Sequence, residues 1–307
     1  MPKGETSMVP EATPTSYYGR PIIKEPTWKW EIPAYLFSGG LSAGSAVLAF
    51  GATLTGNRRL RRSSRFAALA GVTASAGFLV ADLGMPSRFH HMLRVAKVTS
   101  PMSVGTWILA AFGPAAGLAA VSEVTGMLPG VGTAASGVAA LMAPALATYT
   151  AVLVANTAVP VWHEARHHLP FVFAGSAAAA AGGLLTAVVP GSDGAAAARL
   201  AVLGGVLELA AAKQMESAID PLVAEPLHEG LAGRLSRSAR AATSCGVLAL
   251  VVGHRRRSPR LIGGLLLVAG SALERFAIFE AGRQSARDPK YTVHPQKHTP
   301  EPEKHTP

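Results

Sequence analysis

The sequence predicts an all-α fold, a polytopic integral membrane protein with eight transmembrane helices. Of its 307 residues, 49% are hydrophobic and only 15% are charged, and the mean hydropathy is +0.30. Soluble globular domains carry about 25% charged residues. Four long stretches also lack Lys, Arg, Asp and Glu, and each exceeds the roughly 20 residues that a spanning helix needs. They lie between Glu31 and Arg58, Lys97 and Glu123, Glu123 and Glu164, and Arg166 and Asp193.

Apolar runs bounded by charged and turn residues predict the individual helices. These runs fall at 32–56, 66–83, 102–122, 133–158, 169–189, 195–216, 238–253 and 259–280. An even number of spans places both termini on the same side of the membrane. We therefore expect a polar N-terminal segment (1–31), a membrane domain (32–280) and a polar C-terminal tail (281–307). Small residues such as Ser38–Ser45 and Gly263–Gly264 are expected to form packing faces, because they let helix backbones approach closely.

Charge, cysteine content and the N-terminal pattern exclude several classes. The net charge is +10, but the basic residues sit in short loops between apolar runs, where the positive-inside bias explains them without a nucleic-acid partner. Cys245 is the single cysteine, so the chain can form neither an iron-sulfur cluster nor an internal disulfide. Residues 1–31 lack a charged-then-apolar pattern, so no cleaved signal peptide is expected.

The loops favour one membrane orientation only slightly. The first and last predicted helix pairs are joined by strongly basic loops, which the positive-inside rule places in the cytoplasm. Both termini of this multi-pass protein of the bacterial inner membrane would then lie outside. The opposite side also carries many basic residues, which weakens the argument. The loop residues are Arg58, Arg59, Arg61, Arg62, Arg65, Arg255, Arg256, Arg257 and Arg260.

Ionisable residues inside the spans are the first candidates for function. Asp82, Glu208, Glu274 and Arg275 all fall in or at the end of predicted helices. A charge at mid-bilayer costs about 3 kcal/mol on insertion scales, so such groups are expected to pair or to line a hydrated path. We expect Glu208 to pair with Arg275. Asp82 is expected either to form a structural ion pair with Arg88 or to accept protons at the mouth of a cavity.

Tyr149 and Asn156 are the second candidates. They are seven residues apart, so they share one face of the fourth predicted helix. A phenol and an amide can hydrogen-bond a carbonyl headgroup or, equally, neighbouring helices. His163 and His167 have the spacing of metal ligands, but at a helix end beside Arg166 an interfacial cluster is favoured, and no metal site is predicted.

The histidines argue against haem. All ten lie at span ends, in loops or in the tail, whereas a haem inside a helical bundle needs imidazoles that project from the spans. We therefore expect no haem, and any electrons would arrive from another subunit.

Several segments together carry a resemblance. They are 28–40 (WKWEIPAYLFSGG), 82–86 (DLGMP), 100–103 (SPMS), Tyr149–Thr150, 156–162 (NTAVPVW), 275–282 (RFAIFEAG) and 285–291 (SARDPKY). In order and spacing the sequence resembles the NrfD family, the polysulfide-reductase-type membrane subunits, from about Tyr17 to Tyr291.

The resemblance implies eight helices arranged as two four-helix bundles, without haem, that bind a quinone (menaquinone or ubiquinone) near one membrane face. It also implies electron exchange with a four-cluster ferredoxin-like iron-sulfur subunit, which is connected to a molybdenum or tungsten catalytic subunit. Membrane lipid is the remaining partner. A formate-dehydrogenase-like complex is the first expectation for the assembly, and a polysulfide or other sulfur-compound reductase is the second. The chain would not be catalytic alone.

The resemblance also implies site residues. In the polysulfide reductase type the quinone pocket uses a Tyr on the fourth helix, which matches Tyr149, and a Glu one turn later, where this chain has Leu153. Asp82, Asn156 or Glu164 are candidates to replace that carboxylate. The predicted sites are therefore quinone-binding Tyr149, Asn156, Tyr35, Glu31 and Glu164; proton-path Asp82, Glu208, Glu274 and Arg275; and partner-docking Arg88, Arg94, Lys97 and His163.

The predicted function is two-electron interconversion of quinone and quinol, and the sequence leaves open whether protons are translocated. One alternative is an ion-coupled secondary transporter, because Glu208 and Arg275 with glycine-broken helices would suit an ion path. An inverted repeat between the first and last four helices would favour it, and the sequence has no such echo. Another alternative is a passive membrane anchor of the complex.

Overall fold

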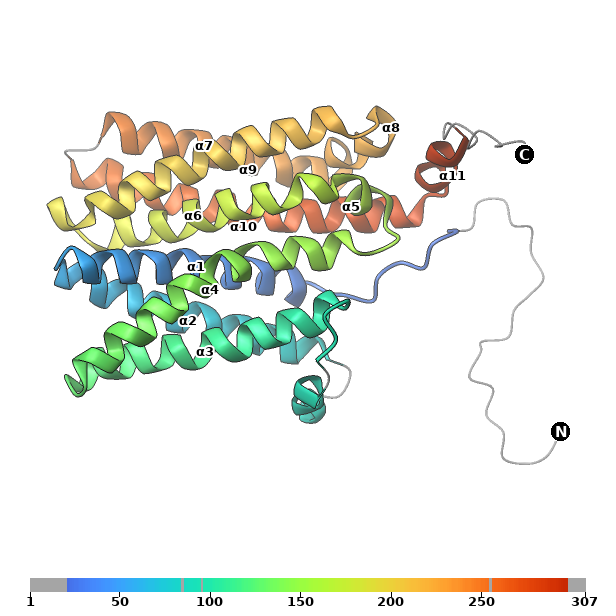
Figure 1. Ribbon diagram of the computed structural model, residues 1–307. Helices are drawn as coiled ribbons and strands as arrows, with labels where there is room; N and C mark the ends of the chain where they lie inside the picture. Colours follow the sequence, from blue (N-terminus) through green and yellow to red (C-terminus); the bar gives the residue numbers. More distant parts are fainter. Residues whose placement is uncertain (1–20, 84–85, 95, 254–255, 298–307) are drawn as a thin grey trace, which may run out of the picture.

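The long helices run side by side along one axis (Figure 1). The structure is a computed structural model that describes residues 21–83, 86–94, 96–253 and 256–297. These residues contain no strand, and the predicted class, an all-α polytopic membrane protein, is confirmed. The long helices are α1 (Glu31–Leu54), α2 (Arg58–Asp82), α3 (Pro101–Thr125), α4 (Pro129–Ala155), α6 (Leu169–Val188), α7 (Ala195–Ala218), α9 (Gly230–Val252) and α10 (Arg257–Arg287).

Short helices connect the long ones. All but one lie at the end of the molecule where α1 begins and α10 ends, which we call the terminal end (Figure 1). The end where α2 and α10 begin is called the opposite end, and it carries η3. The short elements are η1 (Pro86–Arg94), α5 (Pro160–Glu164), η2 (Ala165–His167), η3 (Gly191–Gly194), α8 (Pro221–Ala224), η4 (Glu225–Leu227) and α11 (Lys290–Lys297).

The predicted number of spans is not confirmed. Within the described ranges, seven helices are long and apolar enough to cross a membrane, and α9 is not among them. Its first half carries Arg234, Arg237 and Arg240, which lower its hydropathy. The count of eight spans is therefore not confirmed, although α9 packs along α10 and α7.

Two helices begin well before their predicted starts. α2 begins at Arg58 rather than at 66, because the Asn57 side chain caps it by accepting a hydrogen bond from the Leu60 amide at 3.0 Å. α9 begins at Gly230 rather than at 238, in a segment that hydropathy alone marks as polar. A third helix, α10, ends later than predicted, at Arg287 rather than at 280.

The long helices form two groups of four. α1 to α4 pack together, and so do α6, α7, α9 and α10, while α1 and α6 make the main contact between the groups. The predicted packing faces lie at these contacts. A Cβ atom on Gly44 would lie 2.7 Å from the carbonyl oxygen of Ala177, and one on Gly183 would lie 2.6 Å from that of Gly264. Only glycine allows such an approach.

A buried ion pair joins α2 to α3 at the opposite end. Glu123 accepts hydrogen bonds from Arg61 Nε at 2.8 Å and from Arg65 Nη1 at 2.9 Å. Arg65 also donates to the carbonyl oxygens of Ala119 and Gly132, at 3.3 Å and 3.2 Å. Because the Arg65 side chain is 5% exposed and that of Glu123 is 9% exposed, loss of one partner leaves the other charge buried.

Glu123→Gln is expected to lower the free energy of unfolding by about 3 kcal/mol, the cost of an unpaired buried charge. The matched control is Asp193→Asn, which removes the exposed Arg59–Asp193 pair at 3.3 Å and is expected to cost about 1 kcal/mol or less. Unfolding of the purified protein in detergent measures both values. Equal values for the two variants would contradict the assignment.

Candidate functional site

A cavity of about 640 Å³ lies at the terminal end, between the segment before α3, α3, the end of α4 and α5. We call it the α4 pocket. Its walls are largely apolar, with Val104 and Ile108 on α3 and Val152 on α4. Its polar side chains are those of Thr99, Thr148, Tyr149, Asn156, His163 and Arg166. Two of the predicted quinone-binding residues, Tyr149 and Asn156, therefore line one pocket, as their seven-residue spacing predicted.

Tyr149 is held in place from both sides. A Cβ atom on Gly105 would lie 2.8 Å from Tyr149 Cδ2, so the absent side chain makes room for the ring. The Tyr149 hydroxyl forms a hydrogen bond with the Tyr35 hydroxyl of α1, and either can be the donor. A tyrosine hydroxyl has one proton and two acceptor lone pairs. If Tyr35 donates, the proton of Tyr149 is free for a ligand in the pocket.

Tyr35 is itself fixed by α2. Its side chain is buried, and its carbonyl oxygen accepts a hydrogen bond from Ser75 Oγ at 3.2 Å. Gly39, one turn further along α1, has no side chain where Ser75 approaches. The phenol pair thus links three helices of the first group, α1, α2 and α4.

The far side of the pocket is set by the turn between α4 and α6. Asn156 follows the last residue of α4, and its backbone N–H donates to the carbonyl oxygen of Val152 at 2.9 Å. The next helix, α5, is anchored by Trp162, whose Nε1 donates to the carbonyl oxygen of Ile278 at 2.8 Å. Trp162 is fully buried and stacks on Trp28, with ring centroids 5.8 Å apart. This anchor positions the exposed His163 at the pocket.

Arg166 is a pocket residue that the sequence did not single out. Its Nη1 donates to the carbonyl oxygen of His163 at 3.0 Å, and its side chain is exposed. The three-residue spacing of His163 and Arg166 could have indicated that both side chains lie on one face. That inference requires a continuous helical turn, which exists only because η2 follows α5 without a break. Gly105 was missed for the same kind of reason, because its role appears only when α3 and α4 are packed.

The other predicted quinone-binding and proton residues at this end do not line the α4 pocket. Glu164 is exposed and lines a separate cavity of about 330 Å³ with Tyr291. Glu31 has a buried Oε2 without a hydrogen-bond partner among the described residues. Asp82 accepts a hydrogen bond from the Lys29 amide at 3.4 Å. Leu153, at the position of the carboxylate in the polysulfide reductase type, packs against the core.

The predicted docking residues lie at the same end as the pocket. Arg94 on η1, Lys97 and His163 are all exposed. Lys97 lines a neighbouring cavity of about 330 Å³ that shares Val98, Val104 and Ile108 with the α4 pocket. The side chain of Arg88 lies outside the described part of the structure, so its predicted pairing with Asp82 does too.

The expected pair of Glu208 and Arg275 is not formed as a direct contact, although the two charges lie close enough to interact electrostatically. Both side chains are buried, at 3% and 1% exposure, yet no ion pair within 4.0 Å joins these two described residues. Glu208 instead lies 3.5 Å from Ser271 Oγ, which donates to it. Arg275 turns toward α6, where Nη2 donates to the carbonyl oxygen of Phe173 at 2.8 Å and the guanidinium carbon lies 3.5 Å from the ring centroid.

The buried charges of α7 and α10 lie apart from the α4 pocket. Arg275 sits where α10 meets α6 and α1, since a Cβ on Gly40 would be 3.5 Å from its Nη2. Glu274, also buried, faces the ion pair between Arg240 and Glu216 closely enough to interact electrostatically. The predicted proton-path residues are therefore not brought together with Tyr149 in one cavity.

The segment before α1 is fastened to the end of α10. Glu25 accepts hydrogen bonds from Arg283 Nε and Arg287 Nη2, both at 2.8 Å. The bond from Arg287 and that from Arg283 hold the pKa of the Glu25 carboxyl below its usual value. A lowered pKa adds stability above the pKa of the free carboxyl, and this stability is lost as the pH falls through the folded value.

Acidification is expected to release this segment. Trp28, three residues after Glu25, stacks on Trp162 and reports the release by its fluorescence. We expect a change in emission as the pH falls below about 4, and Glu25→Gln should show the released signal already at pH 7. A Glu25→Gln variant that keeps the wild-type emission and its pH midpoint would show that Glu25 does not fasten the segment.

Taken together, apolar spanning helices in two groups and a mostly apolar pocket at one end define a multi-pass membrane protein of the helical-bundle class. The family model described as polysulfide reductase, of the NrfD type, matches residues 14–288. The chain therefore belongs to the NrfD (polysulfide reductase) family, and it is a membrane subunit of a reductase complex. No curated protein matches the sequence.

Proposed function

We propose that this subunit binds a quinone or quinol in the α4 pocket and exchanges electrons with a partner iron-sulfur subunit. The observation that carries the proposal is the Tyr149 phenol, which lines an apolar cavity at one end of the membrane domain and is held by Tyr35. Membership of the family supports the same assignment.

The residues of the pocket fit a quinone. A quinone headgroup presents two carbonyl oxygens, which need hydrogen-bond donors, on an apolar ring. Tyr149 and the Asn156 amide offer such donors on one helix end, and His163 and Arg166 offer others from the facing turn. The volume of about 640 Å³ lies within the usual range of ligand pockets, roughly 300–1,000 Å³.

A bound quinone supplies two-electron chemistry that takes up or releases two protons. The protein side of this chemistry is hydrogen bonding and proton exchange. If Tyr35 donates the hydrogen bond between the two phenols, the proton of Tyr149 is left for a ligand in the pocket. Because Leu153 leaves no carboxylate on α4, proton exchange falls to the exposed His163 at the pocket, whose ring nitrogens can donate and accept a proton.

The electrons are proposed to come from outside the chain. The histidines within the described ranges all lie outside the long helices, at positions 90, 91, 163, 167, 168, 228 and 294. This arrangement suits direct transfer from a four-cluster ferredoxin-like subunit, itself joined to a molybdenum or tungsten catalytic subunit. Exposed Arg94, Lys97 and His163 near the pocket are the proposed docking residues. A formate-dehydrogenase-like assembly remains the first expectation.

Tyr149→Phe is expected to lower quinol-linked turnover of the assembled complex by about tenfold, because it removes a hydrogen-bond donor to the headgroup. Dye-linked activity of the catalytic subunit should stay unchanged. Tyr35→Phe should have a smaller effect, since it only loosens Tyr149. The matched control is Tyr291→Phe, a tyrosine at the same end that donates to Glu225 at 3.2 Å.

Wild-type quinol turnover in Tyr149→Phe would refute the pocket assignment. An equal loss of quinol-linked and dye-linked activity would instead indicate a defect of assembly, which the amount of partner subunit retained in the membrane measures directly.

A further inference from the structure

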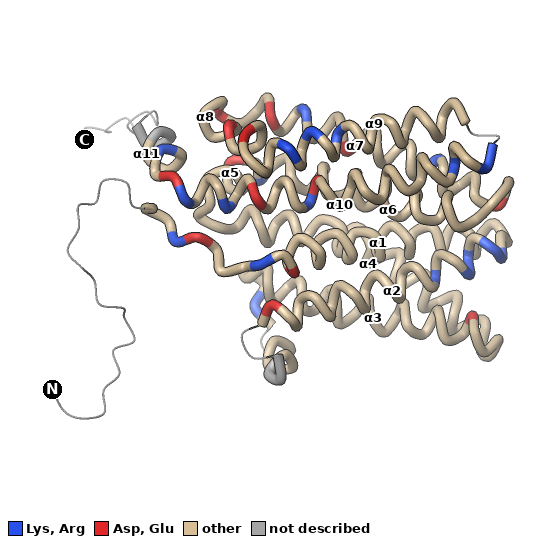
Figure 2. The backbone as a smooth tube through the Cα atoms, turned by 180° about the vertical axis from the view of Figure 1, so that it is seen from behind, with Lys and Arg blue, Asp and Glu red and all other residues tan. Residues whose placement is uncertain are grey.

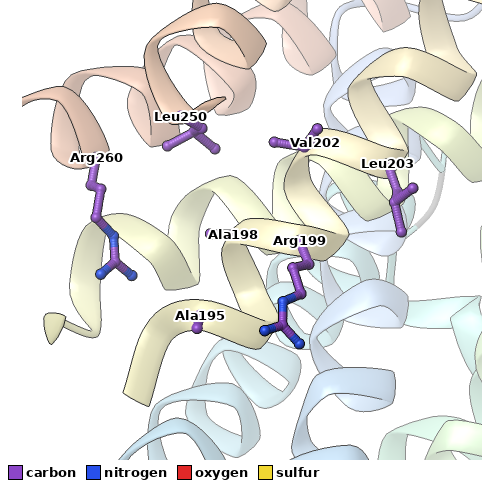
Figure 3. Close-up of a pocket in the computed structure, with 7 residues that line it drawn as sticks. All are labelled: Ala195, Ala198, Arg199, Val202, Leu203, Leu250 and Arg260. Carbon is purple, nitrogen blue, oxygen red and sulfur yellow. The ribbon is translucent and has the colours of Figure 1, made fainter. Parts of the chain in front are cut away.

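A second large cavity lies at the opposite end, away from the α4 pocket. Its volume is about 520 Å³, and Figure 3 shows that its residues come from the first turns of α7, the end of α9 and the start of α10. We call it the α7 groove. Its lining residues are Ala195, Ala198, Arg199, Val202, Leu203, Leu250 and Arg260.

The walls of the α7 groove suit a hydrocarbon chain. Five of its seven lining side chains are apolar, and the small Ala195 and Ala198 leave space along α7 (Figure 3). Leu250 forms a buried wall at 3% exposure, whereas Leu203 is 68% exposed on the outer side. Because α7 is long and apolar enough to span a membrane, we infer that this open side faces the acyl chains of the bilayer.

Two arginines, Arg199 and Arg260, place positive charge at one end of the groove. Ala195 is the first residue of α7, and Arg199 lies one turn further along, while Arg260 lies in the first turn of α10. Figure 3 shows the guanidinium groups reaching from these two helices toward the end where Ala195 lies. Arg260 Nη1 donates to the carbonyl oxygen of Gly191, but its Nη2 is buried without a partner among the described residues.

Basic residues extend beyond the groove. A cavity of about 260 Å³ shares Arg260 and adds Arg256 and Arg257. Figure 2 shows basic residues gathered at this end, whereas the terminal end mixes both signs. The carboxylates here are already committed, because Asp193 pairs with Arg59 and Glu123 pairs with Arg61 and Arg65. Among the described residues, none of the four arginines of the two cavities forms an ion pair.

We propose that the α7 groove binds an anionic phospholipid, with its phosphate between Arg199 and Arg260 and one acyl chain along Ala198, Val202 and Leu250. Guanidinium groups bind phosphate by paired, charge-assisted hydrogen bonds. Basic pockets between spanning helices on one membrane side recognise anionic headgroups in this way. A quinone or a neutral lipid would leave the local positive charge of these arginines uncompensated.

The test measures lipid binding to the full-length purified protein by native mass spectrometry. The probes are dioleoyl phosphatidylglycerol, dioleoyl phosphatidylcholine and inorganic phosphate. We expect the anionic lipid to bind at least tenfold more tightly than the neutral one. Arg199→Gln and Arg260→Gln should each weaken it about fivefold. Arg62→Gln, an exposed arginine at the same end but outside both cavities, is the control and should change nothing.

Ala198→Trp tests the acyl chain separately, because it fills the groove and leaves both arginines in place. It should abolish binding of the anionic lipid, and Arg260→Lys should retain part of it. Equal binding of the two lipids would overturn the proposal, as would full binding by Ala198→Trp. Displacement of the lipid by millimolar inorganic phosphate would point to a free-anion site instead and would also overturn it. Since Arg199 is exposed, Arg199→Gln keeps the test valid if other variants fail to fold.

Discussion

The close contact between α1 and α6 is the constraint on which the rest of the structure depends. Inside a bilayer, helix association draws little from the hydrophobic effect, so it relies on close packing. Gly44 of α1 faces Ala177 and Ala181 at distances that leave no room for a larger residue, and Gly40 lies in close contact with Ala177. Hydrogen bonds at helix contacts, such as Ser42 Oγ to the carbonyl oxygen of Ala68 at 2.6 Å, add only about 0.6 kcal/mol each. Packing therefore fixes the relative position of the two groups.

The placement of the polar groups follows from that contact. Arg275 lies beside Gly40 at the contact between α1 and α6, which we call the seam. There its guanidinium group donates a hydrogen bond to the carbonyl oxygen of Phe173 and lies over the Phe173 ring. Tyr35 lies on the same helix, one turn before Gly39, and reaches Tyr149 across the first group. The seam thus separates two polar regions: a phenol pair at a pocket in the first group, and buried carboxylates in the second. A shift of α1 along α6 would disturb both at once.

Composition and periodicity were enough for the fold class and for five of the long helices to within a few residues, whereas α10 runs past its predicted end at 280 to Arg287. The starts of α2 and α9 were wrong, because hydropathy marks arginines as loop residues. Arg65 and Arg240 nevertheless continue their helices, since Glu123 and Glu216 on neighbouring helices balance them. No property of the linear sequence reveals such partners before the helices are packed.

The candidate site was predictable only in part. Tyr149 and Asn156 share a pocket because their spacing fixes their common face. The bond between Tyr35 and Tyr149 joins residues 114 positions apart and depends on the rotation of two helices about their axes. A direct contact between Glu208 and Arg275 was expected and is not formed, for the same reason. Spacing within one helix tells which residues share a face, but not which face of the next helix they meet.

The arginines of α9 have a consequence for how the chain enters the membrane. A segment with Arg234, Arg237 and Arg240 in its first half is a poor candidate for insertion on its own. Arg240 finds its carboxylate on α7, which is synthesised earlier, and the apolar α10 packs along α9 but is synthesised later. During biogenesis α9 is thus expected to wait at the membrane surface until α10 emerges, and then to enter with it as a helical hairpin against α7.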